Sequence, residues 1–182
     1  KLIPHLDAGK PALTLELSDE EKKLMKEFFL LTSKPTLFAC NVSEADLSAL
    51  AQGKDCGAKK FVDAVKAYAA SHFSTEAVVI SAQIESELVD LSAEEAADYL
   101  QGIGVTSSGV SELIRAVYHL LGLRTYLTTG EQETRAWTIR AGDKAPAAAG
   151  VIHSDFERGF IAAETIAYDD LVSLGSYAKA RE

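Results

Sequence analysis

The sequence predicts an α/β protein, with a helical arm, part of a parallel sheet, and then a small α+β unit. Two apolar runs, at residues 36–40 and 77–80, are each followed by helical patterns, and this alternation favours parallel pairing. After Gly122 the pattern changes to β-rich segments separated by turn-forming residues. We therefore divide the chain into the three segments 1–34, 35–122 and 123–182.

The first segment is predicted to contain one amphipathic helix. Ser18 and Glu21 have the spacing of a capping box, and Leu24, Phe28 and Leu31 follow at helical spacing. The pattern is typical of the returning arm of a helical hairpin.

The middle segment is predicted to run strand, helix, strand and then helices. The apolar run before Asn41 and the run Ala77–Ile80 predict the two strands, and Phe61–Tyr68 carries apolar residues on one helix face. A capping box that begins at Ser92 predicts a short helix. Another helix is expected over Val110–Leu121, where leucines, isoleucine and valines form a stripe.

The last segment is predicted to be a small α+β unit. Thr125–Thr129 and Arg135–Ile139 are expected to form a hairpin, because the residues between them favour a turn. Phe160–Ala167 is expected to form another strand. Helical turns are expected near Ala145–Ala149 and Tyr168–Leu174.

Small polar residues follow both predicted strands of the middle segment. Asn41, Val42 and Glu44 follow the first strand, and Ser81, Ala82 and Gln83 follow the second. Ligands of parallel α/β sheets bind at this edge, so the two strand ends together predict a site for a nucleotide base. A plainer alternative stays open. Ser43 with Asp46 suits a helix cap, and Ser81 suits a turn into a helix over Glu85–Val89.

These motifs and the sequence around them resemble the YchF subfamily of Obg-like P-loop ATPases. Asn41-Val42-Ser43-Glu44 stands where the wider GTPase class has Asn-Lys-x-Asp, and Ser81-Ala82-Gln83 stands at its second base-contacting motif. Arg135–Pro146 and Gly150–Phe160 resemble the terminal TGS domain of that subfamily. The resemblance covers residues 1–182.

The resemblance implies a fold for each segment. Residues 1–34 would belong to a coiled-coil insertion, and residues 35–122 would form the carboxyl-terminal part of a nucleotide-binding G domain with a partial P-loop NTPase-type sheet. Residues 123–182 would form a small α+β TGS domain of the β-grasp type, without its last strand.

The resemblance also implies a ligand, ATP, with GTP as the alternative. The cofactor-binding residues it implies are Asn41, Val42, Glu44, Ser81, Ala82 and Gln83. Val42 and Glu44 replace the Lys and Asp that recognise guanine, which weakens guanine discrimination and permits adenine. A side-chain amide such as Asn41 offers the donor and acceptor that pair with adenine N6 and N7. The backbone N–H of Val42 or Ala82 offers a further contact.

A phosphate-binding motif is not visible in the sequence. Gly53–Lys60 has glycines and lysines, but not the spacing Gly-x-x-x-x-Gly-Lys-Ser/Thr. Phosphoryl transfer depends on such a cradle and its magnesium ion, so the chain is predicted to be inactive alone, with no catalytic or metal-binding residue. The resemblance places catalysis and Mg²⁺ in the amino-terminal part of a longer parent, of which we expect this chain to be the carboxyl-side portion.

Charge and composition limit the partners. A net charge of −9 argues against binding along a DNA or RNA backbone, so RNA contact is expected to be local. A candidate patch consists of Arg135, Arg140, Lys144 and Arg158, although scattered basic residues are more often ordinary surface. The sequence has neither a run of about 18 apolar residues nor a secretory leader, so no membrane partner is expected.

Two functions remain open from the sequence. In the first, the chain supplies the base-recognition loops and a ribosome- or RNA-facing TGS module of a cytoplasmic, translation-associated ATPase. In the second, it is a stand-alone module that binds protein or RNA and turns over no nucleotide. ATP binding distinguishes the two.

Overall fold

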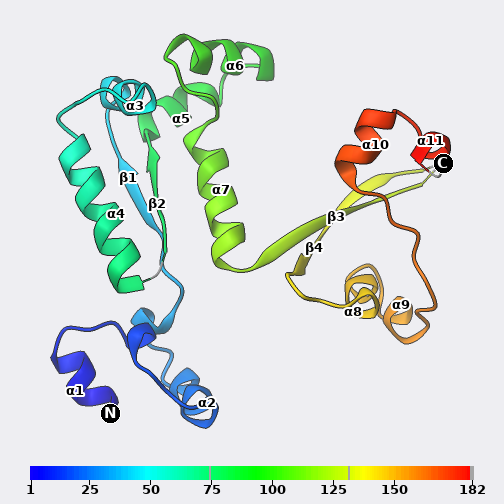
Figure 1. The fold of residues 1–182 in the computed structure, drawn as a ribbon, viewed down its shortest axis with the longest axis horizontal. Helices are drawn as coiled ribbons and strands as arrows, with labels where there is room; N and C mark the ends of the chain where they lie inside the picture. Colours follow the sequence, from blue (N-terminus) through cyan, green and yellow to red (C-terminus); the bar gives the residue numbers. More distant parts are fainter. Residues whose placement is uncertain (74, 131, 181–182) are drawn as a thin grey trace. The chain divides into compact units, whose positions relative to one another are not determined.

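The computed structural model describes residues 1–73, 75–130 and 132–180 (Figure 1). The predicted α/β class is confirmed: the chain has a two-stranded parallel sheet, a two-stranded antiparallel sheet, and helices. Contacts divide it into two units, Lys1–Leu123 and Arg124–Glu182. The functional roles assigned above to the three segments stay predictions.

The first unit begins with short helices, α1 (Leu2–Asp7) and α2 (Asp19–Glu27), and with the 3-10 turns η1 (Ala12–Thr14) and η2 (Leu31–Ser33). The capping box of α2 is confirmed, because the Glu21 backbone N–H donates to Ser18 Oγ and the Ser18 N–H donates to the Glu21 carboxylate. The predicted helix was too long. Phe29 has a φ of 49°, which an α-helix does not accommodate, so Leu31 lies beyond the helix.

The parallel sheet consists of β1 (Phe38–Asn41) and β2 (Ala77–Ile80), joined through α3 (Glu44–Ala51) and α4 (Lys59–Phe73). Parallel strands need such a crossover, and both predicted strands are confirmed. Figure 1 shows α4 and α7 (Gly109–Leu120) on either side of the strand pair. Helix α4 packs on the strands and buries Val62 and Ala69.

The core of this unit lies beside the carboxyl ends of the strands. It is formed by Leu47 of α3, Ile84 of α5 (Ala82–Leu88) and Leu100 of α6 (Ala93–Gly102). The capping box of α6 is confirmed, since Ser92 and Glu95 exchange both capping hydrogen bonds. The predicted start of α5 was wrong by about one turn. The helix begins directly after Ser81 because Ile84, completely buried, holds its first turn against the core.

The second unit contains a hairpin, β3 (Leu123–Thr129) and β4 (Thr134–Arg140), as predicted. Its helices are α8 (Ala145–Gly150), α9 (Ser154–Arg158), α10 (Tyr168–Leu174) and α11 (Tyr177–Ala180). The strand predicted at Phe160–Ala167 was wrong, because this segment is irregular. Ile161 is 95% exposed there, and no strand of the described residues pairs with it.

Candidate functional site

The two predicted base motifs meet at the carboxyl edge of the parallel sheet. Asn41, the last residue of β1, is paired in register with Ile80, the last residue of β2. The Val42 N–H donates to the Ile80 carbonyl at 2.9 Å, which keeps the chains together one residue beyond the strands. The residues that follow β1 and those that follow β2 therefore lie side by side, at the edge where parallel sheets bind ligands.

A hydrogen bond between Asn41 and Ala82 joins these two loops directly. The Ala82 backbone N–H donates to Asn41 Oδ1 at 2.9 Å. Within the described residues the Asn41 Nδ2 group has no protein acceptor, and Asn41 is exposed. The amide thus uses its oxygen to hold the loops and leaves its two N–H donors available to a ligand.

This arrangement changes the roles of two other predicted base-contacting groups. The Val42 and Ala82 backbone N–H groups both have protein acceptors, so a direct contact from either to a base would replace an existing hydrogen bond. The Asn41 side chain was expected to offer adenine both a donor and an acceptor. Because its Oδ1 already accepts from Ala82, only its Nδ2 donors remain for the base.

Ser81 is placed inside the loop and not on its surface. Its side chain is 1% exposed, and its Oγ is the one fully covered side-chain oxygen or nitrogen without a hydrogen-bond partner among the described residues. A buried hydroxyl in this state costs about 1–3 kcal/mol. Ser81 also starts α5 without capping it through its side chain. The loop therefore holds one polar group whose hydrogen-bonding capacity is unused.

Glu44 lies in the first turn of α3, near the hydroxyl of Tyr99 from α6. Burial raises the pKa of Tyr99, and the negative charges of Glu44 and Glu87 raise it further. The Tyr99 hydroxyl donates to Glu87 Oε2 at 3.3 Å, and Gln83 Nε2 donates to Glu87 Oε1 at 3.2 Å. Gln83 and Tyr99 therefore both donate to Glu87, and the charge of Glu44 acts on the same Tyr99 hydroxyl.

Sequence reasoning missed Tyr99, and it also missed two residues that fix the position of β2. Glu85 Oε1 accepts a hydrogen bond of 2.6 Å from the Gly109 backbone N–H, at the start of α7. A Cβ on Gly109 would lie 2.9 Å from Ile80 Cγ2, so only glycine allows α7 to approach β2 this closely. The only sequence signal was a glycine at a helix start, which is weak because glycine is common there.

The plainer helix-entry interpretation is confirmed at one loop. The Asp46 backbone N–H donates to Ser43 Oγ at 3.2 Å, and Ser43 Oγ donates to Asp46 Oδ2 at 2.8 Å. This hydrogen bond from Ser43 is the largest cause of a lowered pKa of Asp46. Capping by Ser43 leaves Asn41 free to serve another role at the same loop.

The four basic residues singled out in the last segment are spread over the second unit. Arg135 and Arg140 lie on β4, Lys144 precedes α8 and Arg158 ends α9. The Arg135 guanidinium stacks over Trp137, 4.4 Å from the ring centre, and the Trp137 indole N–H donates to Thr128 Oγ1 at 2.8 Å. Arg135 therefore has a packing role within the hairpin.

Residues 1–73, 75–130 and 132–180 contain neither a candidate metal site nor a candidate membrane span. No group of three or more His, Cys, Asp or Glu side chains is placed to hold a metal ion. No helix of this part of the chain has the length and apolarity needed to cross a membrane.

The comparisons with known proteins cover the whole chain. The family YchF-GTPase_C, described as a protein of unknown function (DUF933), matches residues 123–182. The ribosome-binding ATPase YchF of Bacillus subtilis is 47% identical over 182 residues, which are 100% of this chain and 48% of that protein. The protein of the same name from Haemophilus influenzae is 38% identical, over 100% of this chain and 47% of its own length.

A solved structure agrees with these matches. The Schizosaccharomyces pombe YchF GTPase has a TM-score of 0.75 and 30% identity, over 96% of this chain and 44% of that one. The chain spans about half the length of the curated relatives it matches. The chain therefore belongs to the YchF family and corresponds to the carboxyl-terminal part of its members.

Proposed function

We propose that this chain supplies the base-recognition edge of a ribosome-binding ATPase, with Asn41 as the central nucleotide contact. The observation that carries the proposal is the hydrogen bond from the Ala82 N–H to Asn41 Oδ1, because it joins the two predicted motifs and leaves the Nδ2 donors of the exposed Asn41 without a protein acceptor among the described residues. Two of the relatives are named as ribosome-binding ATPases, which agrees with this role.

The replacement of the guanine-reading Asp by Glu44 favours adenine over guanine in this proposal. In the wider GTPase class an Asp at this position accepts from the base, and the carboxylate of Glu lies one methylene further from the backbone. The Asn41 Nδ2 group donates to a purine N7, which adenine and guanine share, so it binds without discriminating. Selectivity then comes from the altered position of the carboxylate that would read guanine. ATP is the proposed ligand and GTP the weaker alternative.

Phosphate binding and magnesium belong, in this proposal, to a part of a longer protein outside these residues. Neither a phosphate-binding motif in the sequence nor a cluster of metal ligands among the described residues fits that chemistry here. Sequencing the DNA upstream and downstream of the segment that encodes residues 1–182 tests this point. An upstream Gly-x-x-x-x-Gly-Lys-Ser/Thr after a strand is expected.

The base contact is tested by Asn41→Asp in the complete reading frame. Aspartate keeps an oxygen for the Ala82 N–H but has no N–H donors for the base. We expect Asn41→Asp to weaken ATP binding by about tenfold or more, measured by calorimetry, while the thermal midpoint stays within a few degrees. Asn41→Ala, which loses both roles, should lower binding and stability together. If Asn41→Asp left the affinity for ATP unchanged, Asn41 would only join the two loops and would not contact the base.

The second unit is proposed to face the ribosome or its RNA as a TGS-type module in the cytoplasm. This rests on its match to the carboxyl-terminal domain of the family and on the names of the relatives. The alternative function, a stand-alone protein- or RNA-binding module, agrees with the absence of a phosphate-binding motif from the sequence. A reading frame without an upstream phosphate-binding motif, together with a protein that does not bind ATP, would contradict the ATPase proposal and favour this alternative.

A further inference from the structure

An apolar groove of about 810 Å³ lies among α5, α6 and α7 of the first unit. Helix α6 contributes one complete face to it, formed by Ala93, Ala96, Ala97, Leu100 and Gln101. This spacing of i, i+3, i+4, i+7 and i+8 is that of a single stripe along a helix. Three of these five residues are alanines, so the backbone of an occupant can approach α6 closely.

Two exposed valines stand on the walls of this groove. Val89, at the end of α5, is 81% exposed, and Val110, in the first turn of α7, is 45% exposed. Both line the groove, whereas Leu100 at its floor is buried. Apolar side chains that line a groove and remain exposed are a feature of sites that bind a partner.

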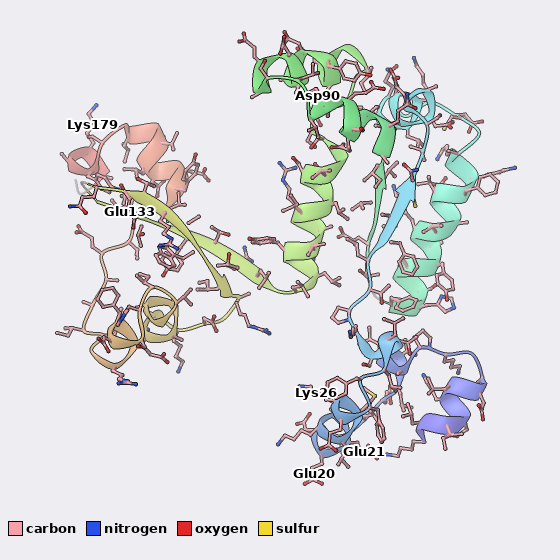
Figure 2. All side chains as sticks on the ribbon, turned by 180° about the vertical axis from the view of Figure 1, so that it is seen from behind. Glu20, Glu21, Lys26, Asp90, Glu133 and Lys179 are labelled. Atoms are coloured by element: carbon pink, nitrogen blue, oxygen red, sulfur yellow. The ribbon has the colours of Figure 1, made fainter. Side chains whose placement is uncertain are left out.

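The charged residues of the segment that forms the groove are acidic. Residues 85–111, which span the groove lining, contain six Asp and Glu and no Lys or Arg, and Arg115 beyond them is paired with Glu112 at 2.6 Å. Asp90 lies in the connection between α5 and α6, next to Val89 (Figure 2), and Glu94 lies on α6 next to Ala93. Both are exposed, and neither forms an ion pair within the described part of the chain. The groove is therefore bordered by unneutralised negative charge.

We propose that this groove binds a basic amphipathic helix of a partner protein. Apolar side chains of such a helix would contact the alanine face of α6, and its Lys or Arg residues would lie against Asp90 and Glu94. The same charges disfavour RNA, whose backbone they repel. They also disfavour a second copy of this chain, which carries a net charge of −9. The proposal does not depend on nucleotide binding.

The test uses three fluorescent peptides of about 18 residues, long enough for roughly five helical turns. The first has leucines along one face and lysines elsewhere, the second is its scrambled form, and the third replaces lysine by glutamate. We expect the first to bind the 182-residue chain and to protect the amides of residues 88–111 from hydrogen exchange. If the scrambled peptide bound as tightly as the first, charge alone would explain the binding and the proposal would be wrong.

Variants locate the binding on the groove. Ala97→Glu places a carboxylate on the alanine face and should weaken binding of the first peptide by about tenfold or more. Its control, Ala64→Glu, changes an exposed alanine of α4 that does not line the groove. The proposal fails if the two variants bind equally well.

A second variant covers the case in which Ala97→Glu misfolds. Asp90→Lys combined with Glu94→Lys keeps the apolar face and reverses two border charges, so the Leu/Lys peptide should bind about tenfold less tightly and the Leu/Glu peptide more tightly. Circular dichroism should show unchanged helix content. Tighter binding of an RNA oligonucleotide than of the Leu/Lys peptide, or self-association through the groove in sedimentation, would also contradict the proposal.

Discussion

The strand edge of the first unit and the hairpin of the second unit are stabilised in different ways. Around the strand edge, Leu47, Ile84 and Leu100 are buried together, and Ser81 is covered as well. In the described part of the second unit no residue is fully buried, and even the hydrogen bond from Trp137 Nε1 to Thr128 Oγ1 is only part-buried. The candidate base site is thus supported by a core, whereas the hairpin depends on local contacts.

The largest effect is expected from Ile84→Ala. Ile84 is completely buried beside the candidate site, so its truncation should lower the free energy of unfolding by about 2–5 kcal/mol. The matched control is Ile161→Ala, at a position 95% exposed, which should change it by less than about 0.5 kcal/mol. Urea unfolding followed by circular dichroism measures both. Similar losses in the two variants would remove the contrast between the units.

A smaller effect is expected from Gly109→Ala. The new Cβ would lie 2.9 Å from Ile80 Cγ2, and relieving this overlap should destabilise the first unit by about 1–3 kcal/mol. Gly102→Ala in α6 is the control, because a Cβ there has no neighbour within 4 Å and should be neutral or stabilising. If Gly109→Ala is as stable as the original chain, α7 does not depend on its close contact with β2.

Acid is expected to destabilise α6, by an amount similar to or smaller than the effect of Gly109→Ala. Hydrogen bonds from the Ser92 side chain, and then from its backbone, lower the pKa of Glu95. A carboxyl whose pKa is depressed by folding stabilises above its unfolded pKa and loses this contribution as the pH falls through its folded pKa. Stability should therefore decline between roughly pH 5 and pH 3.

Ser92→Ala removes the cap and should cost about 1 kcal/mol at neutral pH. Because Glu95 then titrates closer to its ordinary value, the decline with falling pH should also become shallower. Urea midpoints from pH 7 to pH 3 measure both effects. An identical pH dependence in the two proteins would mean that this carboxylate contributes nothing to acid sensitivity.

The smallest effect is expected in the second unit, from Thr128→Val. This change keeps the shape of the side chain but removes the acceptor of the Trp137 indole N–H, at a cost of about 1 kcal/mol. Trp137 is the single tryptophan of the sequence, so its fluorescence reports on this unit alone. We expect the fluorescence transition to shift while the circular dichroism transition of the first unit does not. A shared shift would show that the units unfold as one.

Local signals in the sequence predicted much of the fold. The capping boxes at Ser18 and Ser92, the two parallel strands and the hairpin were all visible as short patterns and are confirmed. The errors lie where distant packing decides the outcome. The burial of Ile84 starts α5 earlier than its pattern suggests, and Phe160–Ala167 lacks the strand partner that its composition favours.

The candidate site was predictable in its position but not in its internal bonding. Two strand ends with Asn41 and Ser81 pointed to the edge of a parallel sheet. The use of Asn41 Oδ1 by Ala82, and the placement of Tyr99 near Glu44, depend on contacts between residues tens of positions apart. The spacing of residue types along a sequence does not tell which distant residues contact each other.

The hydrogen bond between Asn41 and Ala82 also has a consequence for the order of folding. It closes a segment of 41 positions, for which the entropy of loop closure is about 3 kcal/mol or more. One hydrogen bond contributes only about 0.5–1.5 kcal/mol, so it cannot form this loop by itself. The pairing of β1 with β2 and the packing of α4 on both strands close the same loop, so we expect the hydrogen bond to form together with them or after them. A chain that displays the candidate base site is then expected to have completed its crossover.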